Sequence, residues 1–303
     1  MPRRFHTLDV FTENRHEGNP LAVVLDSEGL TDSEMQTIAR EFNLAETVFV
    51  FPPDDQLNAA RIRIFTPGTE LPFAGHPTVG TAILLAELRA AEMLGGAGVT
   101  IVLEEKIGPV RVDVSRKPSR ASRAVFSLPS LPKLLPLQFD PLVVAQAIGL
   151  DAQEIGFGAH GIAAWSAGVP FVMVPVRSLE AIGRAGVADP RAWAQAFGVT
   201  GKGAAYIYTR ETVRPEHHVH ARMFSPAMGI PEDPATGSAV AAFAGVAATC
   251  ELPEDGVHQL VIEQGFEMGR PSLIALDLDI QHGGLVAAAI GGSAVRMSEG
   301  VLL

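Results

Sequence analysis

The sequence has a single cysteine and no long apolar run. Because Cys250 has no second cysteine to pair with, the chain lacks an intramolecular disulfide framework and any Cys-x-x-Cys metal or redox motif. This usage is typical of a reducing compartment, and we expect the cytoplasm. The N-terminal residues MPRRFHTLDVFTEN lack the apolar segment of a signal peptide, and no stretch reaches the ~18 apolar residues that a membrane span needs.

Basic residues are also in short supply. The chain contains 23 Lys and Arg residues against 34 Asp and Glu, which gives a formal net charge of -11. Nucleic acids and anionic membranes attract clusters of positive charge, so this balance argues against both as partners. No Gly-Lys-Ser/Thr phosphate loop or Gly-x-Ser-x-Gly elbow is present. We therefore expect a small-molecule ligand.

What the sequence does contain is enough apolar material for a large core. Hydrophobic residues make up 47% of 303 residues, a length that suggests about two domains. Runs of β-branched and aromatic residues predict strands over residues 5–11, 21–25, 47–51, 62–66, 100–103 and 110–114. These strands are too many for a βαβ array, which favours an α+β unit with a mostly antiparallel sheet curved around one long helix.

Two helices interrupt these strands. The first follows Thr31, a good N-cap residue, and carries Asp32 and Glu34 at the end where a helix dipole favours acids. Its apolar stripe consists of Met35, Ile38, Ala39 and Phe42. The second helix is expected over about residues 78–93, directly after a Gly-His-Pro turn.

The chain repeats itself. At a shift of 159 residues, Arg63, Phe65, Thr66, Pro67 and Pro72 fall on Arg222, Phe224, Ser225, Pro226 and Pro231. Two further blocks, which precede this one in each half, are also similar and occur in the same order. GNPLAVVL resembles GVPFVMVP, and TVFVFP resembles AYIYTR. Three similar blocks in one order predict two copies of one unit.

A Ser-, Pro- and base-rich segment over residues 115–141 has the composition of a solvent-exposed connection. We therefore predict an N-terminal half over residues 1–125 and a C-terminal half over residues 126–303. Whether the last strand packs on the N-terminal half is left open.

Each copy has a glycine-containing turn at the start of a helix, AGHPTVG in the first and DPATGS in the second. Unpaired backbone N–H groups and the helix dipole favour an anion at such a place. The alternative is that both turns are strand-to-helix corners that need glycine for packing. The repetition favours a shared cleft between the halves that holds an acidic ligand.

The reactive side chains beside these turns differ between the copies. The first turn has His76, and the second has Glu232 and Asp233. Turn or N-cap roles are alternatives for Asp233, and capping or packing for His76. Glu46 precedes a run of Val and Phe, where partial burial would raise its pKa toward a range useful for proton transfer; a solvated acid is the alternative.

The histidine-rich run HHVH at residues 217–220 suggests a metal site. His218 and His220 alternate onto one face of a predicted strand, and no carboxylate or cysteine follows at the spacing of a known site. We interpret the run as a feature of the strand and expect no metal.

Together these motifs resemble the PhzF-like family of phenazine-biosynthesis isomerases, which is related to diaminopimelate epimerase. The resemblance extends along nearly the whole chain and lies in DVFTENRHEGNPLAVVL, MQTIAREFNLAETVFV, IRIFTPGTELPFAGHPTVGTA and GIPEDPATGSA. It implies two pseudo-symmetric domains, each a mostly antiparallel sheet wrapped around a central helix, with the active site between them. It also implies a homodimer and no cofactor.

The resemblance assigns roles residue by residue. The catalytic glutamate of the family falls on Glu46, its histidine on His76 and its aspartate on Asp233, while Gly75, Gly237 and Ser238 occupy positions that hold the carboxylate of the substrate. The related epimerases use two cysteines, and a single Cys250 argues against that mechanism.

The chemistry that fits is a cofactor-independent proton or double-bond shift in a small unsaturated carboxylate, similar to that of trans-2,3-dihydro-3-hydroxyanthranilate isomerase. Glu46 would remove and return the proton, and His76 and Asp233 would orient the substrate. Two alternatives remain: an amino-acid epimerase or racemase with Glu46 and Asp233 on opposite faces of one carbon, and a metabolite-binding protein without turnover.

Overall fold

The computed structural model describes residues 2–251 and 254–303. The chain divides into two compact units, one formed by the residues up to Ser127 with Gly291–Leu303 and the other by Leu128–Ile290. The sequence placed the boundary after residue 125, and the first unit continues to Ser127. Strand β17 (Gly284–Leu302) begins in the second unit and ends in the first. Among the described residues, no helix has the length and apolar character that crossing a bilayer would require.

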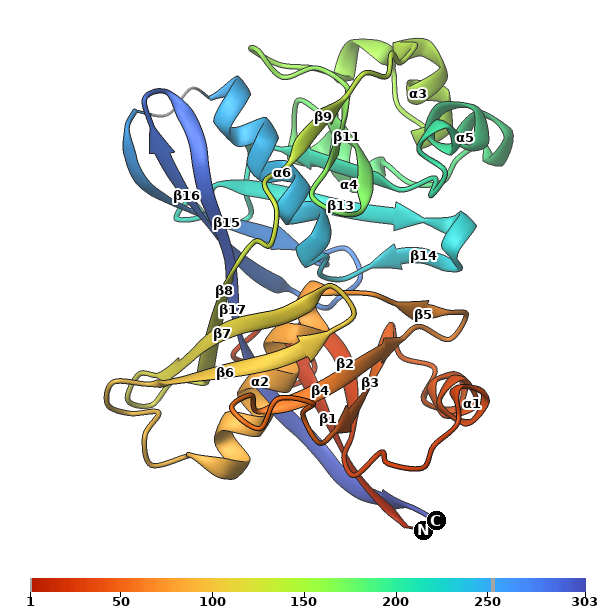
Figure 1. The fold of residues 1–303 in the computed structure, drawn as a ribbon. Coiled ribbons are helices and arrows are strands. Elements are labelled where there is room, and N and C mark those ends of the chain that lie inside the picture. The colour runs from red at the N-terminus through yellow and green to blue at the C-terminus, as the bar shows by residue number, and fades with distance from the viewer. Residues whose placement is uncertain (1, 252–253) are drawn as a thin grey trace. The chain divides into compact units, whose positions relative to one another are not determined.

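The first unit is a mixed sheet with two helices (Figure 1). Its elements are β1 (Arg3–Val10), β2 (Asn19–Val24), α1 (Asp32–Phe42), β3 (Glu46–Phe51), β4 (Ala60–Phe65), β5 (Glu70–Leu71), α2 (Gly75–Arg89), β6 (Val99–Glu105), β7 (Gly108–Arg116) and β8 (Ser122–Ser127). Most pairs are antiparallel, whereas β2–β3 and β4–β6 are parallel.

Helix α1 begins where the sequence predicts. The Thr31 side chain accepts from the Glu34 backbone N–H, and the Glu34 carboxylate accepts from the Thr31 backbone N–H. This capping box satisfies two of the N–H groups that a helix start leaves unpaired. Met35 and Ala39 turn inward against Phe49 and Phe65, as the predicted stripe requires.

Helix α2 is buried from Gly75 to Ala86 and contacts strands β1, β2, β3, β6, β7 and β8. It starts three residues earlier than predicted, since Pro77 is tolerated in a first turn, where its missing N–H is not needed. At Gly80 a Cβ atom would lie 2.6 Å from the Leu21 side chain, so glycine permits the close approach of the helix to β2.

The second unit has the same kinds of element. They are β9 (Lys133–Leu135), α3 (Pro141–Ile148), β10 (Ala163–Ser166), β11 (Pro170–Pro175), α4 (Leu179–Arg184), α5 (Pro190–Phe197), β12 (Ala205–Thr209), β13 (Val219–Ser225), β14 (Ile230–Asp233), α6 (Gly237–Cys250), β15 (Gly256–Gln264), β16 (Ser272–Gln281) and three short 3₁₀ turns. Helix α6 contacts β9, β10, β11 and β16, and Gly245 lies against the ring of Trp165. A second core forms where α3, α4 and α5 pack on β11 and β12.

The two units share an order of strand pairings. In the first, β1–β2 is antiparallel, β2–β3 parallel, β3–β4 antiparallel and β4–β6 parallel. In the second, β10–β11, β11–β12, β12–β13 and β13–β15 follow the same sequence. A buried helix enters at the same point in each, after β5 and after β14.

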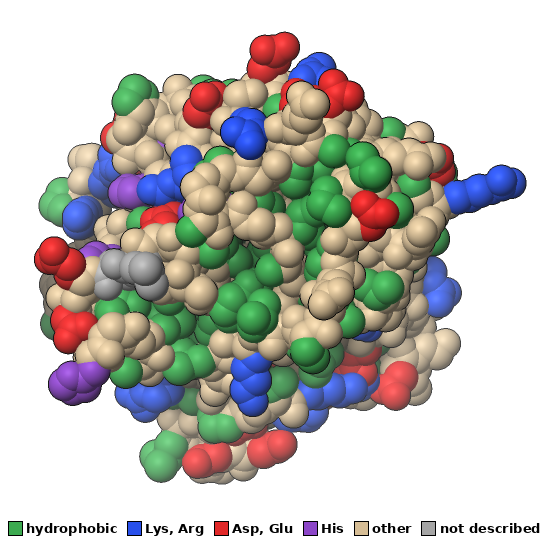
Figure 2. All heavy atoms as spheres, turned by 90° about the horizontal axis from the view of Figure 1, so that it is seen from above, with side chains coloured by type: hydrophobic (Ala, Val, Ile, Leu, Met, Phe, Trp, Pro, Cys, Tyr) green, Lys and Arg blue, Asp and Glu red, His purple; other side chains and the backbone are tan. Residues whose placement is uncertain are grey.

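The prediction of an exposed connection over residues 115–141 is wrong in part. Strand β8 lies inside it and pairs with β7. Ser122, Ala124 and Phe126 point inward in alternation, because the run SRAVFS has the two-residue period of a half-buried strand. Charged side chains elsewhere are mixed in sign, and Figure 2 shows acidic and basic groups interspersed on the face that it draws.

Candidate active site

Glu46 and His76 lie against each other inside the first unit. Glu46 is the first residue of β3, whose other residues are buried Thr, Val and Phe, and His76 is the second residue of α2. The His76 Nε2 atom lies 3.2 Å from Glu46 Oε2. Exposure is 9% for Glu46 and 4% for His76, so the pair is buried. The solvated-acid alternative for Glu46 is therefore wrong.

His76 is a neutral imidazole. Burial lowers its pKa to about 3, because an imidazolium loses its hydration inside the protein. A neutral ring has one N–H donor and one acceptor nitrogen, so it can orient a polar group or relay a proton. It does not cap α2, whose N-cap residue is Ala74.

The start of α2 presents backbone N–H groups beside this pair. Ala74 offers no side-chain cap, while the Thr78 N–H bonds back to the Ala74 carbonyl. The N–H groups of Gly75 and His76 lie at the positive end of a helix of 15 residues. A carboxylate is the kind of group that such an end stabilises.

Behind this turn lies an acid that the sequence analysis missed. Glu105 is the last residue of β6, is 8% exposed, and its Oε1 lies 2.7 Å from Thr78 Oγ1. Burial raises its pKa to about 8, although the contact with Thr78 acts in the opposite direction. The signal was available: Ile101, Leu103 and Glu105 alternate along one face of the strand, and the predicted strand stopped at Leu103.

In the second unit, Asp233 ends β14 and lies three residues before the N-cap residue of α6. It is not that N-cap, because Thr236 takes the position. The Thr236 hydroxyl donates to Asp233 Oδ2, and the Gln264 side-chain amide donates to the Asp233 carbonyl. Asp233 is 7% exposed. The N-cap interpretation of Asp233 is therefore wrong.

Gly237 and Ser238 are the first two residues of α6, as Gly75 and His76 are of α2. Thr236 makes no side-chain capping bond, since its hydroxyl is directed to Asp233. Gly237 is buried, whereas Ser238 is partly exposed. Of the predicted site residues, Glu46, His76 and Gly75 belong to the first unit, and Asp233, Gly237 and Ser238 to the second.

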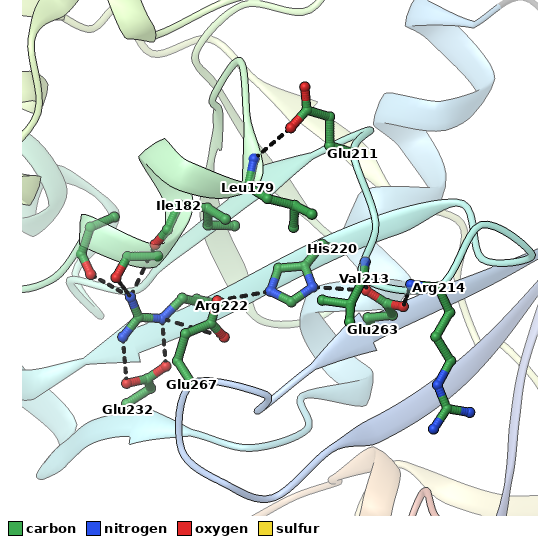
Figure 3. A network of polar contacts seen from close by, with 12 residues as sticks. Leu179, Ile182, Glu211, Val213, Arg214, His220, Arg222, Glu232, Glu263 and Glu267 are labelled. Carbon is green, nitrogen blue, oxygen red and sulfur yellow. Dashed lines mark hydrogen bonds and ion pairs between the residues drawn. The ribbon is translucent and has the colours of Figure 1, made fainter.

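The histidine-rich run forms an ionic network, not a plain strand face (Figure 3). His220 bonds to Glu263 and Glu267, and His217 bonds to Glu263. Burial alone would lower the pKa of His220, but these two carboxylates raise it to about 9. His217 and His218 precede β13, so only His220 of the three lies in the strand. The carboxylates come from residues far along the chain, where spacing within the run could not reveal them.

The network continues to the residue next to Asp233. Arg222 binds Glu232 through two nitrogens at 2.8 and 2.9 Å, donates to the carbonyls of Ile182 and Ala185, and lies 4.0 Å from Glu267. Figure 3 shows the contacts running from His220 through Glu267 and Arg222 to Glu232. Within residues 2–251 and 254–303, no cluster of three or more His, Cys, Asp or Glu side chains is arranged to hold a metal ion.

The sequence matches the model of the phenazine biosynthesis-like protein family over residues 8–300. The chain is 54% identical to an uncharacterized isomerase of Mesorhizobium japonicum, covering 99% of this chain and 98% of that one. It is 32% identical to the trans-2,3-dihydro-3-hydroxyanthranilate isomerase of Pseudomonas aeruginosa, over 98% of each chain. The chain belongs to the phenazine biosynthesis-like (PhzF) family, and its relatives support an isomerase.

Solved structures agree with this assignment. The PhzF family protein of Bacillus anthracis superposes with a TM-score of 0.87 at 27% identity, covering 100% of this chain and 99% of that one. A hydroxyproline epimerase of Agrobacterium vitis, 13% identical over 99% of this chain and 91% of that one, has a TM-score of 0.61 and shares the fold. The predicted relation to epimerase folds is thus supported at the level of architecture.

Proposed function

We propose that this isomerase moves a proton, and with it a double bond, in a small unsaturated carboxylate of amino-acid type, without a cofactor. The observation that carries the proposal is the buried Glu46–His76 pair beside the uncapped start of α2. Proton abstraction from carbon needs a base close to the carbon and a group that stabilises the developing negative charge. Both lie within the first unit.

Glu46 is the proposed base. Its carboxylate takes a proton from a carbon next to an electron-withdrawing group, and the electron pair left behind moves along the conjugated system. Glu46 then returns the proton at the far carbon, so that the substrate neither gains nor loses atoms. Apolar neighbours in β3 exclude water, which strengthens the electrostatic interactions of the pair.

His76 is the proposed orienting group. As a neutral ring 3.2 Å from Glu46, it can hold an amino or hydroxyl group of the substrate without adding a charge that would stabilise the carboxylate and weaken the base. The backbone N–H groups of Gly75 and His76 hold the substrate carboxylate, because the positive end of α2 favours an anion.

We assign Asp233, Gly237 and Ser238 to the same reaction, Asp233 as a second orienting and proton-relaying group and the other two as carboxylate-binding groups. What supports this is the matching geometry in the second unit, in which an uncapped buried helix begins beside an acid. We also propose a homodimer, as the family resemblance implies.

The test is proton exchange in heavy water, followed by NMR. trans-2,3-Dihydro-3-hydroxyanthranilate is the first compound, followed by a panel of cyclic and acyclic unsaturated amino acids. Glu46→Gln keeps the shape of the side chain and removes the base, so deuterium incorporation should fall by roughly 10²- to 10⁴-fold. Glu41→Gln, an exposed change in α1, is the matched control and should retain the wild-type rate.

Unchanged deuterium incorporation in Glu46→Gln would overturn the assignment of the base. The nature of the product separates the isomerase from the epimerase alternative. A shifted double bond supports the proposal, whereas inversion at one carbon with the double bonds in place supports an epimerase. An epimerase would use Asp233 as the acid on the opposite face, so Asp233→Asn would then block exchange in one direction only.

A further inference from the structure

Gln264 directs every hydrogen-bonding atom of its side chain at one short segment. The two amide hydrogens go to the Asp233 carbonyl at 2.8 Å and to Thr236 Oγ1 at 2.9 Å, and Oε1 accepts from the Thr236 backbone N–H at 3.2 Å. The side chain is 0% exposed. A buried primary amide whose donors and acceptor are all used has one orientation available to it.

The backbone of Gln264 is fixed on both sides. In β15 it pairs with Ala221 of β13 on one side and with Ser272 of β16 on the other. The next residue, Gly265, has a φ of +77°, and a Cβ atom there would lie 2.6 Å from the Pro234 carbonyl. Glycine is required because the strand end approaches the Asp233–Thr236 segment so closely.

The hydrogen bonds also fix the direction of the protons. Gln264 donates to Thr236 Oγ1, so the single hydroxyl hydrogen of Thr236 is left for another acceptor. That acceptor is Asp233 Oδ2. The amide of Gln264 therefore aims the Thr236 hydroxyl, and the Thr236 hydroxyl holds one oxygen of the Asp233 carboxylate.

We propose that Gln264 is a positioning residue, which acts through Thr236 to fix the Asp233 carboxylate and the entry into α6. The inference rests on the role proposed for Asp233. Glutamate is no substitute despite its shape, because a carboxylate has no donor and a protonated carboxyl has one, where the segment requires two. An angular error of a few tens of degrees in a catalytic group is enough to lower turnover strongly.

The test uses Gln264→Leu, which removes the polar atoms at similar volume, and Thr236→Val, which removes the hydroxyl alone. Each should lower the turnover number by on the order of 10²-fold, since a misplaced group loses the oriented state. Thr236→Ser keeps the hydroxyl and should restore most of the rate. Gln259→Leu is the matched control, an exposed glutamine on the same strand, and should not change turnover.

A double-mutant cycle separates positioning from general loss of structure. In an Asp233→Asn background, adding Gln264→Leu should lower turnover by less than about threefold further, because residues that act through one another are not additive. Full additivity would overturn the positioning role. Should Gln264→Leu not fold, the pair Thr236→Val and Thr236→Ser carries the same cycle.

The outcomes distinguish this inference from the proposed function. Loss of turnover in Glu46→Gln but not in Gln264→Leu or Thr236→Val leaves the base in place and overturns the positioning role. Loss in Gln264→Leu but not in Glu46→Gln overturns the base and keeps the positioning role.

Hydrogen exchange of the Thr236 backbone amide is a test that needs no substrate. Gln264→Leu removes one hydrogen bond from this amide and should speed its exchange by at least about tenfold. An unchanged exchange rate overturns the inference.

Discussion

Glu105 and Gln264 occupy matching places in the two units and differ by one functional group. Each is the last residue of a strand, β6 or β15, that pairs in parallel with β4 or β13. Both are buried. Glu105 bonds to the first turn of α2, and Gln264 bonds to the residue just before α6. One is a carboxylic acid and the other an amide. Burial favours the neutral form at both places, because it raises the pKa of Glu105 and Gln264 carries no charge.

The hydrogen bonds of the Thr78 hydroxyl show how a carboxylic acid can occupy this place. Its Oγ1 lies 2.8 Å from the Ala74 carbonyl and 2.7 Å from Glu105 Oε1. A carbonyl only accepts, and the hydroxyl has one hydrogen. An ionised Glu105 accepts from Thr78, which lowers its pKa, but burial outweighs this and raises the pKa; in the protonated form Glu105 can instead donate to Thr78 and leave that hydrogen for Ala74. In Gln264 neutrality is built into the side chain.

A second pair of matching residues shows where the copies have kept the same chemistry. Arg63 binds Glu70 through two nitrogens and lies over the ring of Phe65. Arg222 does the same with Glu232 and Phe224. Arg222 has in addition three backbone carbonyls, those of Ile182, Gly183 and Ala185, where Arg63 has the exposed Asp32. Arg63 therefore lies at a more solvent-exposed site than Arg222.

Replacing either arginine should produce the largest effects on stability, and the effect should be larger for Arg222 than for Arg63. Arg222→Met removes a buried charge and leaves Glu232 and three backbone carbonyls without their donor, so the free energy of unfolding should fall by about 3 to 5 kcal/mol. Arg63→Met should lower it by less, because Asp32 can return to water. Urea denaturation of both variants measures the difference. Equal losses would show that the extra contacts of Arg222 add nothing.

The sequence could predict both correspondences, but not the groups to which the Glu105 and Gln264 side chains bond. Arg63 and Arg222 lie at a shift of 159 residues with flanking Phe and Pro, so the repeat reveals them directly. Glu105 and Gln264 lie at the same shift and end two similar runs, IVLEE at residues 101–105 and LVIEQ at residues 260–264. Their hydrogen bonds to Thr78 and Thr236 depend on which strands pair in parallel, and such long-range pairing is set by the packing of the whole unit.

The same limit applies to the candidate site. Motif positions predicted a helix beside the Gly-His-Pro segment and a strand beginning beside Glu46, because glycine, proline and β-branched residues act at short range. The partners of Asp233 and of the HHVH run could not be predicted. Gln264 lies 31 residues from Asp233 and Glu263 lies 43 residues from His220, so no local spacing joins them. The predicted start of α2 is wrong because Gly75, His76 and Pro77 form the first turn of the helix and not a turn before it.

Glu105→Gln tests the comparison between acid and amide directly. The pKa of Glu105 is about 8 in the folded protein against an ordinary 4.5, so the folded state holds the proton more tightly. Its stabilising contribution is therefore complete below pH 4.5 and is lost as the pH rises toward 8. Glutamine has no such loss. At pH 8 we expect the variant to be more stable than the wild type by on the order of 4 kcal/mol.

The matching measurement is urea denaturation from pH 5 to pH 8. The gap between Glu105→Gln and the wild type should be small at pH 5 and should widen steadily. Glu104→Gln, its neighbour whose partly exposed carboxylate accepts from the backbone N–H groups of Asp54 and Asp55, is the control and should not widen the gap in this way. A gap that stays constant with pH would mean that Glu105 is ionised in the folded protein.

The smallest expected effects on stability come from two threonines, one that caps the start of its helix and one that does not. Thr31 uses its hydroxyl to cap α1, whereas Thr236 holds the N-cap position of α6 and turns its hydroxyl to Asp233. Thr31→Val should lower the free energy of unfolding by about 1 kcal/mol, the usual contribution of an N-cap, and should leave turnover unchanged. Thr236→Val should lower turnover far more than its loss of stability alone would. Were Thr31→Val to lower turnover as much as Thr236→Val, the distinction between a stabilising threonine and a positioning threonine would fail, and the Asp233 segment would be no more than another helix cap.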